Sequence, residues 1–213
     1  MVHPSDDPDV ISDPAALREH YGEPLGVAVA MSRGHLDAHH RRFIAHSPFV
    51  CIASASDDGF PCVSPRGDAP GFVHVRDDHT LVVPDRPGNN KVETYQHLLR
   101  NPRMGIIFFV PGVKETLRVQ GTATLVLDDA TRELGRKGEA LPVASLVVKV
   151  ARAYLHCGKS IVRSKLWDPS QHVAPGVIPS FGQMVKDQAG VDHTAEEMQQ
   201  AIDASYVRAL TDA

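Results

Sequence analysis

A succession of short, β-prone segments joined by turn residues constrains the fold of this chain more than any other feature of its sequence. From Phe49 to Pro84, the segments FVCIASAS, PCVSPRG, FVHV and TLVVP alternate with turns such as DDGF and RDDH. A helical stretch follows at residues 91–100. Two further strands are then expected on either side of the loop PGVKE, at RMGIIFFV and TLRVQGTATLVL. Another strand is expected at ASLVVKVARAYLHC. Short hairpin links favour antiparallel pairing, and five to seven strands favour a barrel over an open sheet.

Helices are expected on both sides of this strand-rich region. PAALREHYG (14–22) and HLDAHHRRFIAHS (35–47) have helical spacing, and Thr194 with Glu197 forms a capping-box signature before a third helix. That helix carries an apolar stripe typical of packing: Met198, Ile202, Tyr206 and Leu210. The sequence thus predicts a mainly β fold with peripheral helices. It is divided into an N-terminal arm and helix (1–30), a strand-rich domain (31–190), and a C-terminal helix (191–213) packed on that domain.

The composition of the 213 residues is that of an ordinary water-soluble domain, with 42% hydrophobic and 23% charged residues. The net charge of −4 gives no global positive field, so a nucleic-acid partner is not expected. Apolar runs such as VAVAM and GIIFFV are too short to cross a bilayer, and the acidic N-terminus lacks a signal-peptide pattern. The three cysteines form no CxxC pair. We therefore expect a reduced, cytoplasmic protein with no membrane partner.

The segment PDRPGNNKVET (84–94) lies where a strand passes into a helix. Asn90, with Glu93 three residues later, predicts a helix N-cap residue and the acidic side chain that bonds back to it in a capping box. A cap does not require Arg86 or Lys91, however, and the earlier SPRG adds Arg66 beside a hydroxyl group. Backbone amides, polar side chains and cations are the groups that bind a phosphate. From the residues alone, both a plain helix cap and an anion site remain open.

Other chemistry has little support in the sequence. Three histidines of the 35–47 helix share a face, but Arg41 and Arg42 on the same helix would repel a metal ion, so no metal site is expected. There is no G-x-S-x-G motif, and Cys51 and Cys62 lie within apolar strands, where a structural cysteine is typical. The pattern identifies no catalytic residue.

Four stretches of the chain, taken in order, resemble a known family: SDDGFPCVSPRGDAPGFVHV, TLVVPDRPGNNKVETYQHLLRNPRMGIIFFVPG, ETLRVQGTATLV and HCGKSIVRSKLWDP. They are similar to the pyridoxamine 5′-phosphate oxidase-like flavoproteins, and more narrowly to a bacterial branch with the patterns PDRPGNN and HCxKxxxRSxLW. The resemblance covers about residues 30–185. It implies an antiparallel, FMN-binding split β-barrel at 31–190 that works as a homodimer, with two flavin sites at the subunit interface.

The resemblance also implies which residues hold the cofactor. The strand residues around Arg66 would lie along the flavin, and the stretch ending in Lys91 would grip its phosphate at the helix start. The region around Trp167 would arrive from the partner subunit, and Trp167 either covers the ring or anchors the interface. The expected cofactor-binding residues are Val63, Ser64, Pro65, Arg66, Pro84, Asp85, Arg86, Asn89, Asn90, Lys91, Arg163, Ser164 and Trp167.

The activity implied by the resemblance is an FMN-dependent oxidoreductase that moves a hydride to or from an unidentified small molecule, with NAD(P)H as a candidate partner. The chain ends in DASYVRALTDA and lacks the arginine- and histidine-bearing end of the oxidase proper, so pyridoxamine phosphate is not the expected substrate. One alternative is a flavin-binding carrier or regulator without turnover. Another is the same barrel with a deazaflavin or a haem, for which His156 or a nearby histidine is the candidate axial ligand.

Overall fold

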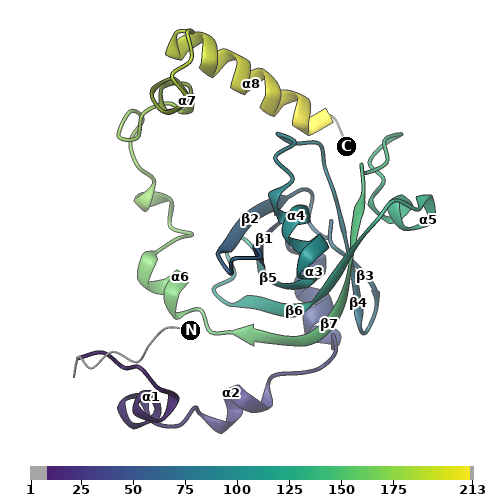
Figure 1. The fold of residues 1–213 in the computed structure, drawn as a ribbon, viewed down its shortest axis with the longest axis vertical. Coiled ribbons are helices and arrows are strands. Elements are labelled where there is room, and N and C mark those ends of the chain that lie inside the picture. The colour runs from purple at the N-terminus through teal and green to yellow at the C-terminus, as the bar shows by residue number, and fades with distance from the viewer. Residues whose placement is uncertain (1–8, 212–213) are drawn as a thin grey trace.

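The computed structural model of the chain describes residues 9–211, and its centre is one seven-stranded antiparallel sheet (Figure 1). The mainly β class with peripheral helices is therefore confirmed. The strands are β1 (Phe49–Ala55), β2 (Pro61–Gly67), β3 (His74–Asp77), β4 (Thr80–Pro84), β5 (Arg103–Phe109), β6 (Thr116–Val126) and β7 (Ser145–His156).

The strand order is β2-β1-β5-β6-β7-β4-β3, and every neighbouring pair runs antiparallel. The sheet curls around its core but does not close on itself, because β2 and β3 remain as its two edges within the part of the chain that the structure describes (Figure 1). The molecule is thus a split barrel rather than a closed cylinder. This agrees with the split β-barrel that the sequence resemblance implies.

The longest pairing joins β6 to β7, and a bulge interrupts it between Gln120 and Gly121. A Cβ atom at Gly121 would lie 2.1 Å from the carbonyl oxygen of Lys149, so this position accepts only glycine without a backbone shift. Bulges increase the local twist of a strand. The long β6–β7 ribbon can therefore bend around the core.

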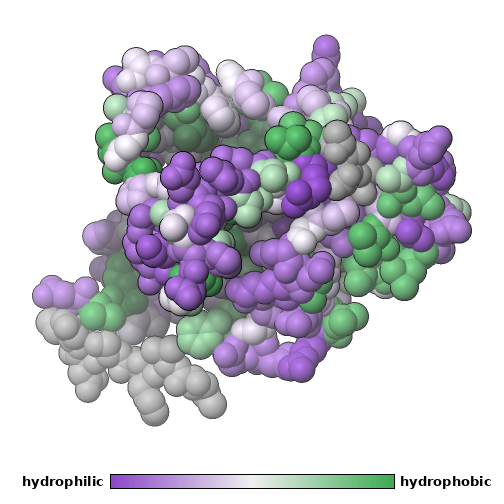
Figure 2. Space-filling model, turned by 90° about the horizontal axis from the view of Figure 1, so that it is seen from above, coloured by the Kyte–Doolittle hydropathy of each residue, from purple (hydrophilic) through white to green (hydrophobic). Residues whose placement is uncertain are grey.

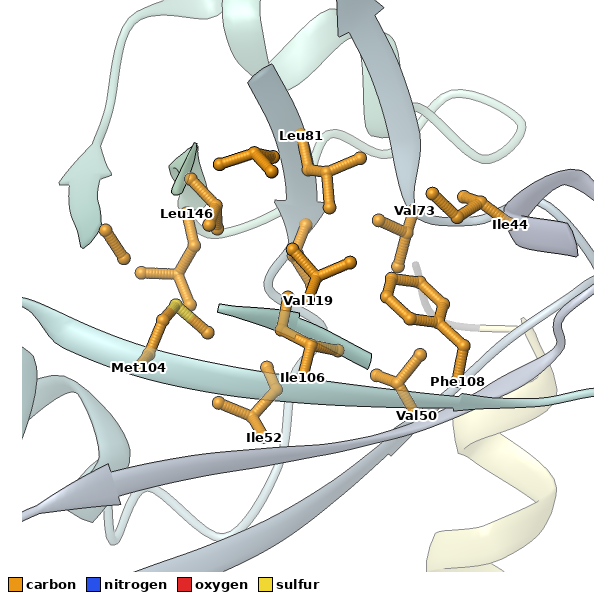
Figure 3. Close-up of a cluster of buried hydrophobic side chains, with 14 of the residues drawn as sticks. Ile44, Val50, Ile52, Val73, Leu81, Met104, Ile106, Phe108, Val119 and Leu146 are labelled. Carbon is orange, nitrogen blue, oxygen red and sulfur yellow. The ribbon is translucent and has the colours of Figure 1, made fainter. Parts of the chain in front are cut away.

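The core lies inside the curled sheet and follows the alternation of the strands (Figure 3). Val50 and Ile52 of β1 face inward opposite Phe108 and Ile106 of β5, and all four are at most 3% exposed. Burying each such side chain contributes about 1.5–3 kcal/mol relative to leaving it in water. The opposite sides of these strands carry residues that are exposed or only half-buried, such as Phe49 and Cys51.

The helix α4 (Glu93–Arg100) links β4 to β5 and packs on β1 and β6. It buries Thr94, Tyr95 and Leu98, which lie on one side of the helix. The sequence predicted a helix at 91–100, and the observed helix begins two residues later. Because of this placement, the start of α4 lies beside the ends of β2 and β4.

The remaining helices surround the sheet or extend from it. They are α1 (Pro14–Tyr21), α2 (Gly26–Ala30), α3 (Ala38–Ala45), α5 (Asp129–Arg132), α6 (Lys159–Ser164), α7 (Phe181–Ala189) and α8 (Ala195–Thr211). The predictions for α1, α3 and α8 are confirmed, and Thr194 and Glu197 form the expected capping box. The sequence interpretation did not include α2, α5, α6 or α7.

One strand differs from the prediction. The segment FVHV was expected as a strand, whereas β3 begins at His74; Phe72 and Val73 lie in the turn before it and are buried. Apolar residues in a short run are therefore buried here without belonging to the sheet.

Residues 1–8, most of the predicted N-terminal arm, lie outside the described residues, and the division of the chain into three parts remains a prediction. In residues 9–211, no helix is long and apolar enough to cross a membrane.

Candidate functional site

A cleft of about 580 Å³ opens between β2 and the segment that leads from β4 into α4. It is lined by residues 62–67, residues 85–95 and Val143. Its volume falls in the range of about 300–1,000 Å³ that is usual for small-molecule sites. The two sequence segments with candidate phosphate-binding groups thus form the two walls of one cleft.

The loop wall of the cleft has an unusual backbone. Asn90 has a φ of 57° and Val92 a φ of 46°, while the residues between and beside them have negative φ. A β-branched residue with positive φ is rare and strained. Alternation of this kind points successive N–H groups toward one concavity, which is a known way of binding anions. The loop is therefore shaped for an anion at a cost to its own conformation.

The predicted N-cap at Asn90 is wrong. The N-cap of α4 is Val92, which has no side-chain cap, and the Asn89 carboxamide oxygen instead accepts from the Lys91 N–H at 3.1 Å. The left-handed turn at Val92 delays the start of the helix and leaves the N–H groups of Glu93 and Thr94 without an acceptor among the described residues. Free amides at a helix start favour an anion.

Arg66 is the cation of the strand wall. Its guanidinium donates to the Ser64 hydroxyl and to the carbonyl oxygen of Pro65 at 2.8 Å. It also lies over the ring of Tyr95, 6.0 Å from the ring centre, at the outer limit of a cation–π contact. Arg66 has no carboxylate partner in residues 9–211. Its charge is held in place and remains available to a ligand.

Tyr95 and Asp85 form the floor of the cleft. Tyr95 is 9% exposed, and its hydroxyl donates to the Asp85 carboxylate. Burial raises the pKa of the Tyr95 hydroxyl, and the hydrogen bond to Asp85 and the charge of that carboxylate raise it further. Tyr95 therefore stays protonated at neutral pH and serves as a fixed hydrogen-bond donor.

Arg86 lines the cleft but is already paired. Its Nε donates to Asp68 at 2.8 Å, and Lys137 lies 3.6 Å from the other oxygen of the same carboxylate. Burial alone would raise the pKa of Asp68, but the Ala69 amide and the charges of Arg86 and Lys137 outweigh it and hold the pKa below 3.8. Arg66 and Lys91 are thus the cleft cations least engaged by carboxylates, and the Nη1 of Arg86 is buried with no hydrogen-bond partner within residues 9–211. The exposed Lys91 has only a loose 3.6 Å contact with Glu93.

Cys62 is the one thiol in the cleft. Its Sγ lies 3.6 Å from a carboxylate oxygen of Glu93. Burial raises the pKa of this thiol, and the negative charge of Glu93 raises it further. A thiolate is the nucleophilic form of cysteine, so Cys62 is not poised for nucleophilic catalysis.

The structure brings together most of the predicted cofactor-binding residues. Those that line the cleft are Val63, Ser64, Pro65, Arg66, Asp85, Arg86, Asn89, Asn90 and Lys91. Pro84 lies just beneath it, buried at the end of β4 against Gly135. Arg163, Ser164 and Trp167 do not reach the cleft of their own chain. Arg163 borders a separate hollow of about 310 Å³, and the Trp167 indole N–H donates to the Val113 carbonyl at 2.8 Å.

The sequence interpretation missed Tyr95, Asp68 and Lys137. Tyr95 is three residues before Leu98 in a helical stretch, and this spacing could have marked it as inward-facing. No local pattern connects Asp68 to Arg86 or Lys137, because that cluster joins three separate loops.

The histidine candidates lie apart from the cleft. His156 ends β7, where burial and the nearby charge of Arg118 lower its pKa. Across residues 9–211, no group of three His, Cys, Asp or Glu side chains is arranged to hold a metal ion.

The fold is an antiparallel split barrel, and its cleft lies between a strand and the start of a helix. The sequence matches the profile of the pyridoxamine 5′-phosphate oxidase family over residues 36–157, and the chain belongs to this family. The match spans the whole sheet and both walls of the cleft, and it ends before α6.

A search of curated proteins finds no match. Among solved structures, the chain is similar to HupZ of Group A Streptococcus, with 18% identity, 56% of this chain and 92% of that chain covered, and a TM-score of 0.45. It is also similar to a putative pyridoxamine 5′-phosphate oxidase of Lactobacillus delbrueckii (22% identity, 57% and 95% covered, TM-score 0.46). An FMN-binding protein of Syntrophomonas wolfei gives 11% identity, 66% and 95% coverage, and a TM-score of 0.45.

Proposed function

We propose that this protein binds FMN in the cleft and acts as an FMN-dependent oxidoreductase on a small molecule. The observation that carries the proposal is the loop at residues 89–93. It combines alternating φ, two amides without acceptors and the cation Lys91, facing Arg66 across the cleft. A phosphate monoester needs this set of groups. Membership of the pyridoxamine 5′-phosphate oxidase family makes FMN the phosphate-bearing ligand of choice.

Different residues would contact the two ends of the cofactor. Asn89, Asn90 and Lys91 would hold the phosphate at the start of α4, and residues 63–66 would lie along the flavin. Bound FMN supplies the hydride chemistry, while the protein positions it and sets its electrostatics. Arg66, held by Ser64 and by the Tyr95 ring, keeps a fixed positive charge beside the ligand. Such a charge favours an anionic reduced cofactor.

The protein is proposed to work as a homodimer with two flavin sites at the subunit interface. In a single chain, Arg163, Ser164 and Trp167 lie away from the cleft, and residues 62–67 form an edge strand whose outer side is open. A partner subunit would bring its own Arg163 region to this side. Trp167 would then cover the ring or anchor the interface. We place the protein in the cytoplasm, with NAD(P)H as the candidate reductant and no nucleic-acid partner.

The absorption spectrum tests the proposal. Purified protein is mixed with excess FMN, passed through gel filtration, and compared with an Arg42→Ala control, which removes an exposed cation on α3. We expect flavin bands at about one equivalent per chain in both proteins. A colourless protein after gel filtration would refute FMN as the ligand. A Soret band in the protein as purified would instead support haem, and a deazaflavin spectrum would support the related cofactor.

A second candidate function is flavin binding without turnover, as a carrier or regulator. The observation that favours it is that the Cys62 thiol and the Tyr95 hydroxyl, whose pKa values are both raised, stay protonated at neutral pH, so neither of these two groups is poised as a base or nucleophile. Stopped-flow reduction of the FMN-loaded protein by NADH and NADPH separates the two candidates. Reduction and reoxidation faster than those of free FMN would support the enzyme, and rates equal to free FMN would support the carrier.

A further inference from the structure

The helices α7 and α8, here called the C-terminal hairpin, form a preformed unit. The N–H of Gly182 donates to the Gln199 side chain at 2.9 Å, and a Cβ at position 182 would lie 2.3 Å from the Ala195 carbonyl oxygen. The two helices therefore cross in backbone contact. The Thr194–Glu197 capping box fixes the start of α8. The hairpin has a defined shape without help from the barrel.

The hairpin exposes an apolar stripe. On α8, Met198 and Ile202 are half-buried, but Tyr206, Val207 and Leu210 are 58%, 64% and 76% exposed. No residue from 195 to 210 is buried, and the hairpin lies apart from the sheet in Figure 1. Figure 2 shows several green, hydrophobic patches exposed between hydrophilic residues on the face seen from above. Exposed apolar surface of this kind marks an interaction site.

The segment that joins the hairpin to α6 is long and equally exposed. Residues 165–180 contain one 3-10 turn, and Leu166, Val173, Val177 and Ile178 are 49–66% exposed. Sixteen extended residues reach about 50 Å. A compact chain of this length has a radius of gyration of about 17 Å. The segment is therefore long enough to carry the hairpin across a neighbouring molecule of the same size.

Charge is divided unevenly along the chain. Residues 191–213 contain five acidic residues and one basic residue, whereas residues 31–190 contain twenty basic and fifteen acidic residues. The end of the chain is thus acidic, and the region that holds the barrel is basic. Opposite net charges favour association of these two parts, within one chain or between copies.

The outer side of the barrel offers a matching surface, which we call the outer face. Its apolar part comes from β1 and β5, where the ring centres of Phe49 and Phe109 lie 6.0 Å apart beside the half-buried Ile107. Its basic part comes from β6 and β7, where Arg118 pairs with Tyr154 and Arg152 with Gln120. Both arginines are exposed, and neither has an ion-pair partner within residues 9–211. Two unpaired cations on adjoining strands favour an acidic partner.

We propose that the C-terminal hairpin of each protomer docks on the outer face of a second copy, in a reciprocal exchange. The apolar end of α8 covers Phe49, Ile107 and Phe109, and the acidic side chains near its start lie against the arginines of β6 and β7. Each copy carries both the donated element and the receiving face, so a two-fold pair satisfies both at once. This goes beyond the proposed cofactor site, because it assigns a partner to segments outside the cleft and outside the family match.

Photo-cross-linking with isotope mixing tests this exchange in the full chain without any flavin. Benzoylphenylalanine replaces Leu210, and unlabelled variant is mixed with ¹⁵N-labelled protein, exchanged in mild denaturant and irradiated. We expect cross-links from position 210 to peptides of β1, β5 or β6 that join one unlabelled and one labelled chain. The same probe at Gln200, an exposed polar position of α8, is the control and should give at most about a tenth of the yield.

If every cross-link to the outer face joins two unlabelled peptides, the proposal is overturned, because the hairpin then covers its own barrel. Cross-links to any other surface, or none above the Gln200 control, would overturn it as well. Sedimentation velocity gives a second test. Tyr206→Glu with Leu210→Glu should weaken self-association about tenfold or more, and Gln200→Glu should leave it unchanged. Equal association of both variants would contradict the exchange, whatever the FMN titration shows.

Discussion

The two walls of the cleft are built in opposite ways. On one side, β2 pairs with β1 along its whole length, from Pro61 to Gly67, and presents Arg66 from a regular strand. On the other side, residues 86–93 pair with no strand in the described part of the chain, and positive φ at Asn90 and Val92 turns backbone amides toward the cleft. A rigid strand thus places a side-chain charge, whereas a strained loop places main-chain donors.

Removing the cation from both walls should have the largest effect. We expect Arg66→Ala combined with Lys91→Ala to weaken FMN binding at least about 100-fold, because each charge-assisted hydrogen bond contributes about 1.5–3 kcal/mol. Fluorescence titration of FMN measures the loss, with Arg42→Ala as the control. Unchanged FMN affinity in the double variant would refute the phosphate assignment.

The Asp68 cluster, which fastens the loop wall to the barrel, should give the next largest effect. Asp68→Asn removes the ion pairs with Arg86 and Lys137, and we expect it to lower the free energy of unfolding of the protein without ligand by about 2–3 kcal/mol at pH 7. Urea unfolding measures it.

The pH dependence of this difference has a definite sign. The pKa of Asp68 is lowered in the folded protein, so its contribution is present above pH 4 and is lost as the pH falls through the folded pKa. The stabilities of wild type and Asp68→Asn should therefore converge as the pH approaches 2. A gap that stays constant from pH 7 to pH 2 would contradict the role given to this carboxylate.

Tyr95→Phe tests the hydrogen bond in the floor of the cleft and should have a smaller effect. Loss of the hydroxyl removes the hydrogen bond to Asp85, and we expect the free energy of unfolding to fall by about 1–1.5 kcal/mol at pH 7. The folded pKa of Tyr95 is raised above 10, so this contribution is complete below pH 10 and is lost as the pH rises beyond it. The difference in the free energy of unfolding between wild type and Tyr95→Phe should be smaller at pH 11 than at pH 7. A difference that grows with pH would contradict this expectation.

Glycine substitution in each wall should give the smallest effects, with opposite signs. Val92→Gly relieves a strained positive φ, and we expect a gain of about 0.5–1 kcal/mol in the free energy of unfolding. Val63→Gly, at an exposed position of β2, should lose about 0.5–1 kcal/mol. Thermal unfolding of both variants makes the comparison. Equal losses at the two positions would remove the distinction between a strained and an unstrained wall.

The sheet could be predicted from sequence because alternation is a local signal. Val50 and Ile52 face the core while Phe49 and Cys51 do not, and this period of two is visible in the letters of β1. Phe72 and Val73 show the limit of that signal. They are apolar and buried but take no part in the sheet, since pairing depends on partners that are distant in sequence.

The cleft could be predicted only in part. Arg66 and Lys91 were found because cations beside turn residues are visible in a sequence, but the cap expected at Asn90 failed. The left-handed conformation of Val92 is imposed by the surrounding loop and opposes the preference of a β-branched residue. α7 is a different case. Its Ser180 cap and the left-handed Gly190 after it are ordinary start and stop signals, which could have identified it.

A paired titration with FMN and riboflavin tests the phosphate site, because the two ligands differ only in the phosphate. If residues 89–93, with Arg66 opposite, hold a phosphate, the protein should bind FMN at least about 100-fold more tightly than riboflavin, and most of that preference should disappear in the Arg66→Ala, Lys91→Ala variant. Equal affinity for FMN and riboflavin would contradict the account, because the loop would then be strained and charged for some other purpose.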